Sequence, residues 1–275
     1  MLAAALALSA SFVWGVVDFV GGTLARRHPV ATIALLGHAT GLAALAVAVL
    51  LIGVDQRALS FGLAAGTFGG VAVFTFYKAM SLGKLSIASP LLACGSVLAF
   101  GIAVAAGERP STLSVVGALV ALAGAVLASI EEHASGGDRR RALGFAFASM
   151  FALGGYLYLL GRGSADGGTL SAVFGARTTS SSLLLLLVFG LGSSLRIGWR
   201  AYGLLALIGL GAAVAFILYG YAADIGLISI ASVLSSLYPV VTVVLAHVFL
   251  GERLGRIQLA GLPLVLVGVV LVTTA

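Results

Sequence analysis

Apolar side chains dominate ten long runs of the sequence, and polar residues gather in the short stretches between the runs. The runs cover 2–24, 30–52, 59–80, 86–106, 111–130, 142–162, 169–191, 201–222, 229–249 and 255–274. Each holds about 20 residues, and a helix of that length crosses the ~30 Å hydrocarbon core of a bilayer. The pattern therefore predicts an all-α integral membrane protein with ten transmembrane helices.

Two short motifs occur twice and divide the ten helices into two sets of five. The first copy has Ser-Ile-Ala-Ser at 86–89 and, after an apolar run, Gly107-Glu108-Arg109. The second has the same tetrapeptide at 229–232, followed by Gly251-Glu252-Arg253. The tetrapeptides lie 143 residues apart, so we expect two copies of one unit.

The number of helices in each copy sets how the two copies are related. Because five is odd, the second copy enters the membrane from the opposite side, which makes the pair an inverted repeat. Two such halves can exchange conformations and so turn an outward opening into an inward one. We expect a first repeat at 1–130, a polar linker at 131–141 and a second repeat at 142–275.

Composition supports this class and narrows the partners. Hydrophobic residues make up 61% and charged residues 9%, against roughly 25% charged in soluble domains. The first run is too long for a signal peptide and has no basic region before it, so we expect a retained helix. Cys94 is alone, which excludes a disulfide framework. We expect a multi-pass protein of the cell membrane, inner or plasma.

The net charge of +6 has a simple explanation in a membrane protein. The basic residues lie in short loops, where anionic lipids and the positive-inside rule account for them, so no nucleic-acid partner is expected. Ten of them fall in the loops on one side and three on the other, which predicts that both termini face out.

With the repeated motifs, Trp14-Gly15 and Tyr238-Pro239 make the chain resemble the EamA-type, ten-helix branch of the drug/metabolite transporter superfamily. The resemblance covers the whole chain and implies transport of amino acids or related compounds. Two departures stand out. Gly95 and Ser96 occupy the place of a proline that this family carries in the fourth helix. Relatives also have both termini in the cytoplasm, against the charge count.

Ionisable residues inside the runs are the main candidates for function, because each costs at least a few kcal/mol in the bilayer unless it is paired or hydrated. Four qualify, namely Asp18, His38, Lys78 and Arg177. At an offset of 139 residues, His38 and Arg177 are equivalent positions of the two repeats. In relatives an arginine often occupies this place, so Arg177 fits the resemblance and His38 departs from it.

Each of these residues has a structural and a functional interpretation. Asp18 is either a buried partner of Arg177 or Lys78, or a proton or cation site that couples transport. His38 is either a packing residue or a second coupling site. Lys78 either extends to the headgroups or, with Arg177, binds an anionic group of a substrate.

Aromatic residues give a second set of candidates for a cavity. Trp14 shares a helix face with Asp18, and Tyr77, Tyr156 and Tyr221 lie in other runs. A tyrosine hydroxyl inside the membrane needs a polar partner, which favours a cavity over lipid. The alternative is that some of these tyrosines belong to the interfacial belt. We expect all four to line a substrate site.

Prolines and glycines indicate hinges and packing. Pro90 and Pro239 fall in equivalent helices, where a proline frees a backbone carbonyl and permits bending. We expect both to act as hinges. Gly62, Gly66 and Gly70 form a ridge that lets helices approach closely. Glu108, like Glu252, is expected to cap a helix and to hold its hairpin.

The sequence contains none of the enzyme motifs we sought. Lys84 is followed by Leu85, so no phosphate-binding Gly-Lys-Ser/Thr loop exists, and the nucleophile and zinc-protease motifs are missing. We therefore expect no enzyme and no cofactor or metal. The leading hypothesis is a secondary active exporter of a small polar or amphipathic metabolite, coupled to protons through Asp18 or His38. The alternatives are an uncoupled facilitator and a non-transporting scaffold or partner subunit.

Overall fold

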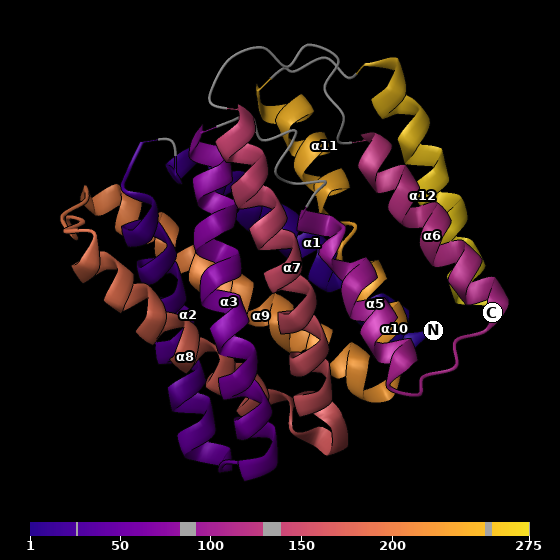
Figure 1. Cartoon of the computed structure of the whole chain (residues 1–275), viewed down its shortest axis with the longest axis horizontal. Coiled ribbons are helices and arrows are strands. Elements are labelled where there is room, and N and C mark those ends of the chain that lie inside the picture. The colour runs from indigo at the N-terminus through magenta and orange to yellow at the C-terminus, as the bar shows by residue number, and fades with distance from the viewer. Residues whose placement is uncertain (26, 83–91, 129–138, 251–254, 275) are drawn as a thin grey trace.

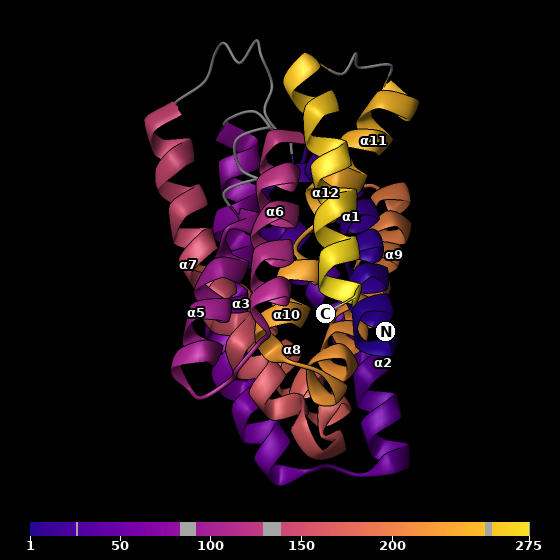
Figure 2. The same ribbon diagram turned by 90° about the vertical axis from the view of Figure 1, so that its right-hand side faces the viewer.

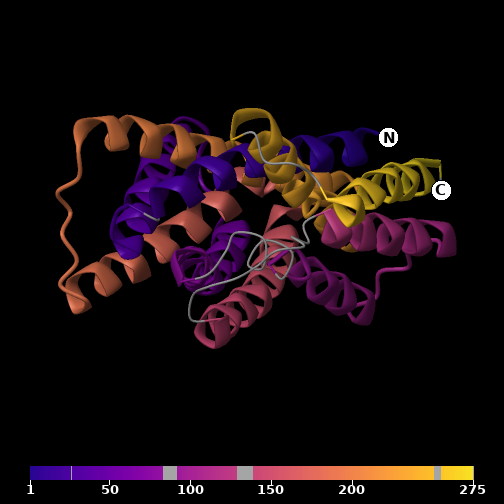
Figure 3. The same ribbon diagram turned by 90° about the horizontal axis from the view of Figure 1, so that it is seen from above.

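The computed structural model describes residues 1–25, 27–82, 92–128, 139–250 and 255–274 (Figure 1). All regular elements in these ranges are helices: α1 (Leu2–Ala25), α2 (Val30–Ile52), α3 (Gln56–Leu82), α5 (Gly95–Ala105), α6 (Thr112–Ala128), α7 (Arg139–Ser164), the short 3₁₀ helix η1 (Ala165–Gly167), α8 (Thr169–Gly190), α9 (Trp199–Ile225), α10 (Ile228–Ser235), α11 (Tyr238–Leu250) and α12 (Arg256–Thr274). The two ends of the chain lie close together (Figures 2 and 3).

Eight segments in the described ranges are long and apolar enough to cross a membrane. The two remaining predicted runs coincide with shorter apolar helices, Gly95–Ala105 and Thr112–Leu127. The described residues therefore support a multi-pass helical protein with eight long spans and two shorter apolar helices, and the count of ten spans stays a prediction. Helix α7 begins at Arg139, inside the segment expected to be a linker.

One of the spans, Ile228–Phe249, is interrupted between α10 and α11. The break falls at Ser236 and Leu237, directly before Tyr238 and Pro239. Proline has no N–H to donate to the carbonyl four residues earlier, so the α-helical ladder stops here. Backbone bonds of the i, i+3 type appear here, from Leu237 to Leu234 and from Val240 to Leu237, and the Ser236 N–H is shared between the carbonyls of Ser232 and Val233. Pro239 thus stands at a real discontinuity, while Pro90 lies outside the described residues.

Helix packing comes in matched sets. Helix α1 packs against α9 and α11, and α7 packs against α3 and α5. At equivalent places of the two repeats, Gly15 faces Val241 and Gly154 faces Leu98. A Cβ on either glycine would overlap its neighbour, so the missing side chain sets these crossing distances.

The predicted glycine ridge of α3 is confirmed as a packing surface. Gly62 and Gly66 face the backbone of Ala172 and Ala176 on α8, and Ser180 donates a hydrogen bond to the Gly66 carbonyl at 2.9 Å. This close approach fixes the rotation of α8. Helices α6 and α12 pair through glycines in the same way and stand together at one edge of the molecule (Figure 1).

The first Gly-Glu-Arg motif joins the two halves. Gly107, with φ 113°, ends α5, and the N–H of Glu108 donates to the Ala103 carbonyl at 3.1 Å. The Glu108 carboxylate then accepts hydrogen bonds from the N–H groups of Ile228 and Ser229, at 2.8 and 2.9 Å. Glu108 was expected to cap a helix of its own hairpin, and instead it caps α10 of the other half.

This carboxylate replaces a cap that α10 lacks. Leu227 stands at the N-cap and has no side-chain hydrogen bond to offer, so the first N–H groups of α10 depend on Glu108. A negative charge at a helix N-terminus adds a favourable interaction with the helix dipole. Ser229 belongs to the second Ser-Ile-Ala-Ser motif, so the two repeated motifs meet across the halves.

We predict that Glu108→Ala lowers the free energy of unfolding by about 1–3 kcal/mol, because two charge-assisted hydrogen bonds and a helix cap are lost. Thermal unfolding of the purified protein in detergent measures the effect. Arg109→Ala is the matched control, since its exposed side chain contacts only the carbonyls of Val104 and Glu108. Equal stability of the two variants would contradict a capping role.

Candidate functional site

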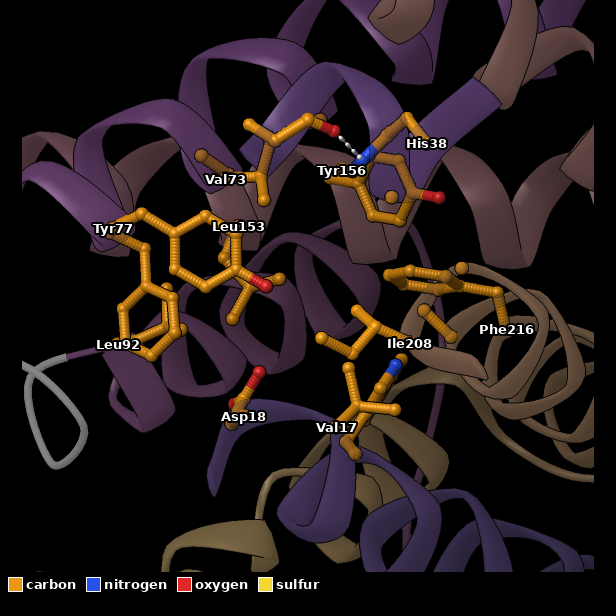
Figure 4. Close-up of a pocket in the computed structure, with 18 of the residues that line it drawn as sticks. Val17, Asp18, His38, Val73, Tyr77, Leu92, Leu153, Tyr156, Ile208 and Phe216 are labelled. Atoms are coloured by element: carbon orange, nitrogen blue, oxygen red, sulfur yellow. Dashed lines mark hydrogen bonds between the residues drawn. The ribbon is translucent and has the colours of Figure 1, made fainter. Parts of the chain in front are cut away.

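A cavity of about 110 Å³ lies at the centre of the helix assembly. One buried water needs roughly 10–15 Å³ of such volume, so the cavity has room for a small organic molecule. Its walls come from helices on both sides of the repeat boundary, and Figure 4 shows the side chains that point into it. Six of the eight predicted binding residues line it: Trp14, Asp18, His38, Tyr77, Tyr156 and Arg177.

The other two predicted residues lie elsewhere. Tyr221 is 38% exposed on the outer face of α9, two residues beyond the buried Tyr219. Two residues correspond to about 200° around a helix, so the two tyrosines face opposite ways. Lys78 follows the cavity residue Tyr77 and is half-buried outside the cavity lining. Neither Tyr221 nor Lys78 is therefore among the residues that line the cavity, contrary to the prediction.

An aromatic wall forms one side of the cavity. The ring of Phe216, on α9, meets those of Trp14 and Tyr156 edge-on, at centroid distances of 4.8 and 4.9 Å. Trp14 also lies 6.2 Å from Tyr219 and 6.3 Å from Tyr238. Phe216 and Tyr238 were not among the predicted site residues. The helical spacing of Phe216 from Tyr219 (i, i+3) was the one available sign that it faces inward.

Arg177 is the most unusual residue of the cavity. It is 1% exposed, and its Nε and Nη2 atoms have no hydrogen-bond partner. Its guanidinium lies 5.2 Å from the centroid of the Phe216 ring, a cation–π contact that leaves the N–H groups unsatisfied. Leaving a buried cation unpaired is costly, so the geometry favours a site completed by an anion or by water.

Helix packing explains why Arg177 points inward. The neighbouring residues Ala176 and Ser180 lie against Gly66 of α3. Because that face of α8 packs against α3, the adjacent residue 177 lies on the face of α8 that is directed towards the cavity. The same contact buries Arg177 too deeply for its side chain to reach a headgroup.

Asp18 lies on α1 at another part of the cavity, with its carboxylate directed inward (Figure 4). It is half-buried and makes no ion pair with Arg177 or Lys78. The exposed Arg57 and Asp166 form an ion pair at 2.9 Å, far from this carboxylate in the sequence and outside the cavity lining. The structural interpretation of Asp18, as the buried partner of a cation, is therefore wrong for this conformation.

His38 lines the cavity from α2, and its ring is held by its own helix. Its Nδ1 lies 3.1 Å from the carbonyl oxygen of Ala34, the bond drawn in Figure 4. A carbonyl only accepts, so Nδ1 carries a proton and Nε2 of the neutral ring is an acceptor. His38 and Arg177, equivalent in the two repeats, thus both line the cavity.

Comparisons with known proteins agree with the fold. A solved structure described as "Crystal structure of protein" is similar over 99% of this chain and 96% of its own length, with a TM-score of 0.79 and 20% sequence identity. None of the curated proteins matches the chain. The EamA-like transporter family matches residues 1–130 and again 140–274. The two matches together span nearly the whole chain, and the protein therefore belongs to the EamA-like transporter family.

Proposed function

We propose that the protein is a secondary active transporter that exports a small polar or amphipathic metabolite, such as an amino acid, by alternating access. The observation that carries this proposal is the unpaired, buried guanidinium of Arg177 in a central cavity. Arg177 holds an anionic group of the substrate, and Trp14 and Tyr156 contact its apolar part. Asp18 or His38 carries the coupling proton.

The matched packing of the halves supports the inverted repeat that alternating access requires. Contacts of α1 with α9 and α11 have their counterparts in those of α7 with α3 and α5. In this proposal the halves exchange these packing arrangements during the cycle. The discontinuity at Pro239 is the hinge, because α10 and α11 can change their mutual angle there without breaking a regular helix.

The cavity favours a transporter over a scaffold or partner subunit. In a scaffold, an unpaired buried charge lowers stability and serves no purpose. An apolar residue of similar size at that position would be more favourable. An uncoupled facilitator also fits the cavity, and it differs from the proposed transporter in a measurable way: its transport rate is indifferent to a pH gradient.

We predict that Asp18→Asn uncouples transport from the proton gradient. The variant keeps the shape of the side chain and removes its ability to ionise. The purified protein is placed in proteoliposomes with and without a pH gradient, and flux of a metabolite panel that begins with amino acids is measured. We expect the gradient to accelerate transport by the wild type and to leave Asp18→Asn unaffected.

Asp224→Asn is the matched control for this experiment. Asp224 is a half-buried carboxylate in the last turn of α9, outside the cavity lining. It should behave as the wild type. Full gradient dependence in Asp18→Asn would exclude Asp18 as the coupling residue and would direct the same test to His38.

A further inference from the structure

The charges of the cavity allow a more specific statement about its cargo. Six ionisable side chains line it, one from each of six helices: Asp18, His38, Tyr77, Tyr156, Arg177 and Tyr238. Helix α9 adds only apolar residues and Gly209 to the lining. Tyrosines are neutral near pH 7, and His38 shares the cavity with the positive charge of Arg177, which disfavours a second cation. Two groups that can carry a full charge remain, Arg177, which is positive, and Asp18, which is negative when it is ionised.

Asp18 and Arg177 form no ion pair with each other. Arg177 can therefore bind an anion, and Asp18 can bind a proton, without breaking a bond between the two side chains. When the cavity is empty and Asp18 is ionised, the net charge is zero. When a monovalent anion binds to Arg177, the cavity becomes neutral again only if Asp18 takes up one proton. An empty cavity with Asp18 protonated is positive, and a loaded cavity with Asp18 ionised is negative.

Alternating access turns this difference into coupling. Halfway through the cycle the cavity is closed to both sides, and a net charge in that low-dielectric space is costly. The empty cavity with ionised Asp18 and the loaded cavity with protonated Asp18 are neutral, so they can pass through the closed conformation. The two charged states pass through it much more slowly. We propose that the cavity carries one carboxylate and one proton together, the carboxylate on Arg177 and the proton on Asp18. This inference rests on the proposed function, and it specifies the cargo and the coupling ratio. Because proton and carboxylate move in the same direction, an inward proton gradient drives uptake, and export follows from an outward gradient of the carboxylate.

The cavity walls indicate which carboxylates fit. The planar guanidinium of Arg177 holds its buried Nε and Nη2 atoms on one edge, the arrangement that binds a carboxylate through two hydrogen bonds. The edge-on rings of Trp14, Tyr156 and Phe216 beside it suit a flat apolar body. A dianion such as phosphate leaves a net negative charge even after Asp18 is protonated. A zwitterionic amino acid arrives neutral and requires no proton, so this inference replaces the amino acid of the proposed function with a simple carboxylate.

Benzoate is a probe with these properties, and benzamide is its neutral counterpart of the same shape. Binding is measured by calorimetry on the purified protein in detergent at an alkaline pH at which Asp18 of the empty protein is ionised, in two buffers with different ionisation enthalpies. The dependence of the heat on the buffer gives the number of protons taken up. We expect one proton for each benzoate bound by the wild type and none for benzamide.

Two variants assign the proton to its site. In Asp18→Asn we expect benzoate to bind without proton uptake and with an affinity that no longer depends on pH. Asp224→Asn, outside the cavity, should take up one proton like the wild type. Loss of the Arg177 charge should weaken benzoate at least tenfold and leave benzamide unchanged.

Several results would overturn the inference: benzoate binding without a proton, a proton that persists in Asp18→Asn, benzoate and benzamide binding alike, or tighter binding of inorganic phosphate. Absence of binding by both benzoate and hexanoate at millimolar concentration would overturn it as well. These failures leave the proposed function standing if the proteoliposomes transport another metabolite. Conversely, proton-linked benzoate binding with no transport of any compound would remove the proposed function and the transport step of the inference, and it would leave only the joint binding of a carboxylate and a proton.

Discussion

Replacing Arg177 with glutamine is expected to abolish transport of anionic metabolites without lowering the stability of the protein. The guanidinium is buried and its Nε and Nη2 have no partner, so its removal relieves the cost of an unpaired charge. The same removal deprives a bound carboxylate of its charged partner. Truncating one member of a buried, hydrogen-bonded charge pair costs about 2–5 kcal/mol, which weakens binding roughly thirtyfold or more.

The experiment combines two measurements on each variant. Flux in proteoliposomes reports the loss of transport, and thermal unfolding in detergent reports stability, for which we expect an unchanged or higher midpoint. Arg177→Lys should retain a part of the activity, because an ammonium keeps the charge and loses the two-pronged geometry. Arg162→Gln is the control, since Arg162 is exposed in the last turn of α7. A strong loss of stability in Arg177→Gln would instead indicate a structural arginine.

The second large effect is expected from Gly209→Val, at the crossing of α2 and α9. A Cβ at this position would overlap the Thr40 hydroxyl and the backbone carbonyl of Gly37. The carbonyl belongs to the helix ladder and cannot turn away, so the helices must separate. Overpacking of this kind costs about 1–3 kcal/mol, and more where backbone is involved. We expect a large drop in the unfolding temperature and poor yield of folded protein.

Gly203→Val tests the explanation on the same helix. Gly203 is exposed on α9, and a Cβ there meets nothing within 4 Å. This variant carries the same change of helix propensity and no collision, so it should unfold near the wild-type temperature. If both variants lost stability equally, the cause would be the residue type and not the helix crossing.

Several parts of the candidate site were predictable from local rules alone. Asp18 and Arg177 stand deep inside apolar runs, where the cost of a charge makes an inward orientation the favoured one. Trp14 shares a helix face with Asp18, so one inward residue implied the other. These predictions place residues at the cavity, and their roles in binding and coupling remain predictions for the experiments above.

The predictions that were wrong depended on rotation about a helix axis. Tyr221 was grouped with inward residues because an aromatic hydroxyl inside a membrane suggests a cavity, yet its place on α9 turns it to the outer face. Phe216 carries no polar atom, so nothing in its chemistry distinguished it from the many other apolar residues. Its position between Arg177, Trp14 and Tyr156 is visible only when three helices are assembled.

The sequence by itself determined that this is a multi-pass helical membrane protein, that it consists of two related units and that it resembles the EamA-type transporters. Apolar run length and repeated motifs are local properties, and the bilayer converts them directly into helices. Only the tertiary structure decided which partners the polar groups find. It directed Glu108 to α10 of the other half and left Arg177 and Asp18 apart across one cavity. Both outcomes depend on how helices distant in the chain pack together, and the glycine contacts that set this packing form only on folding.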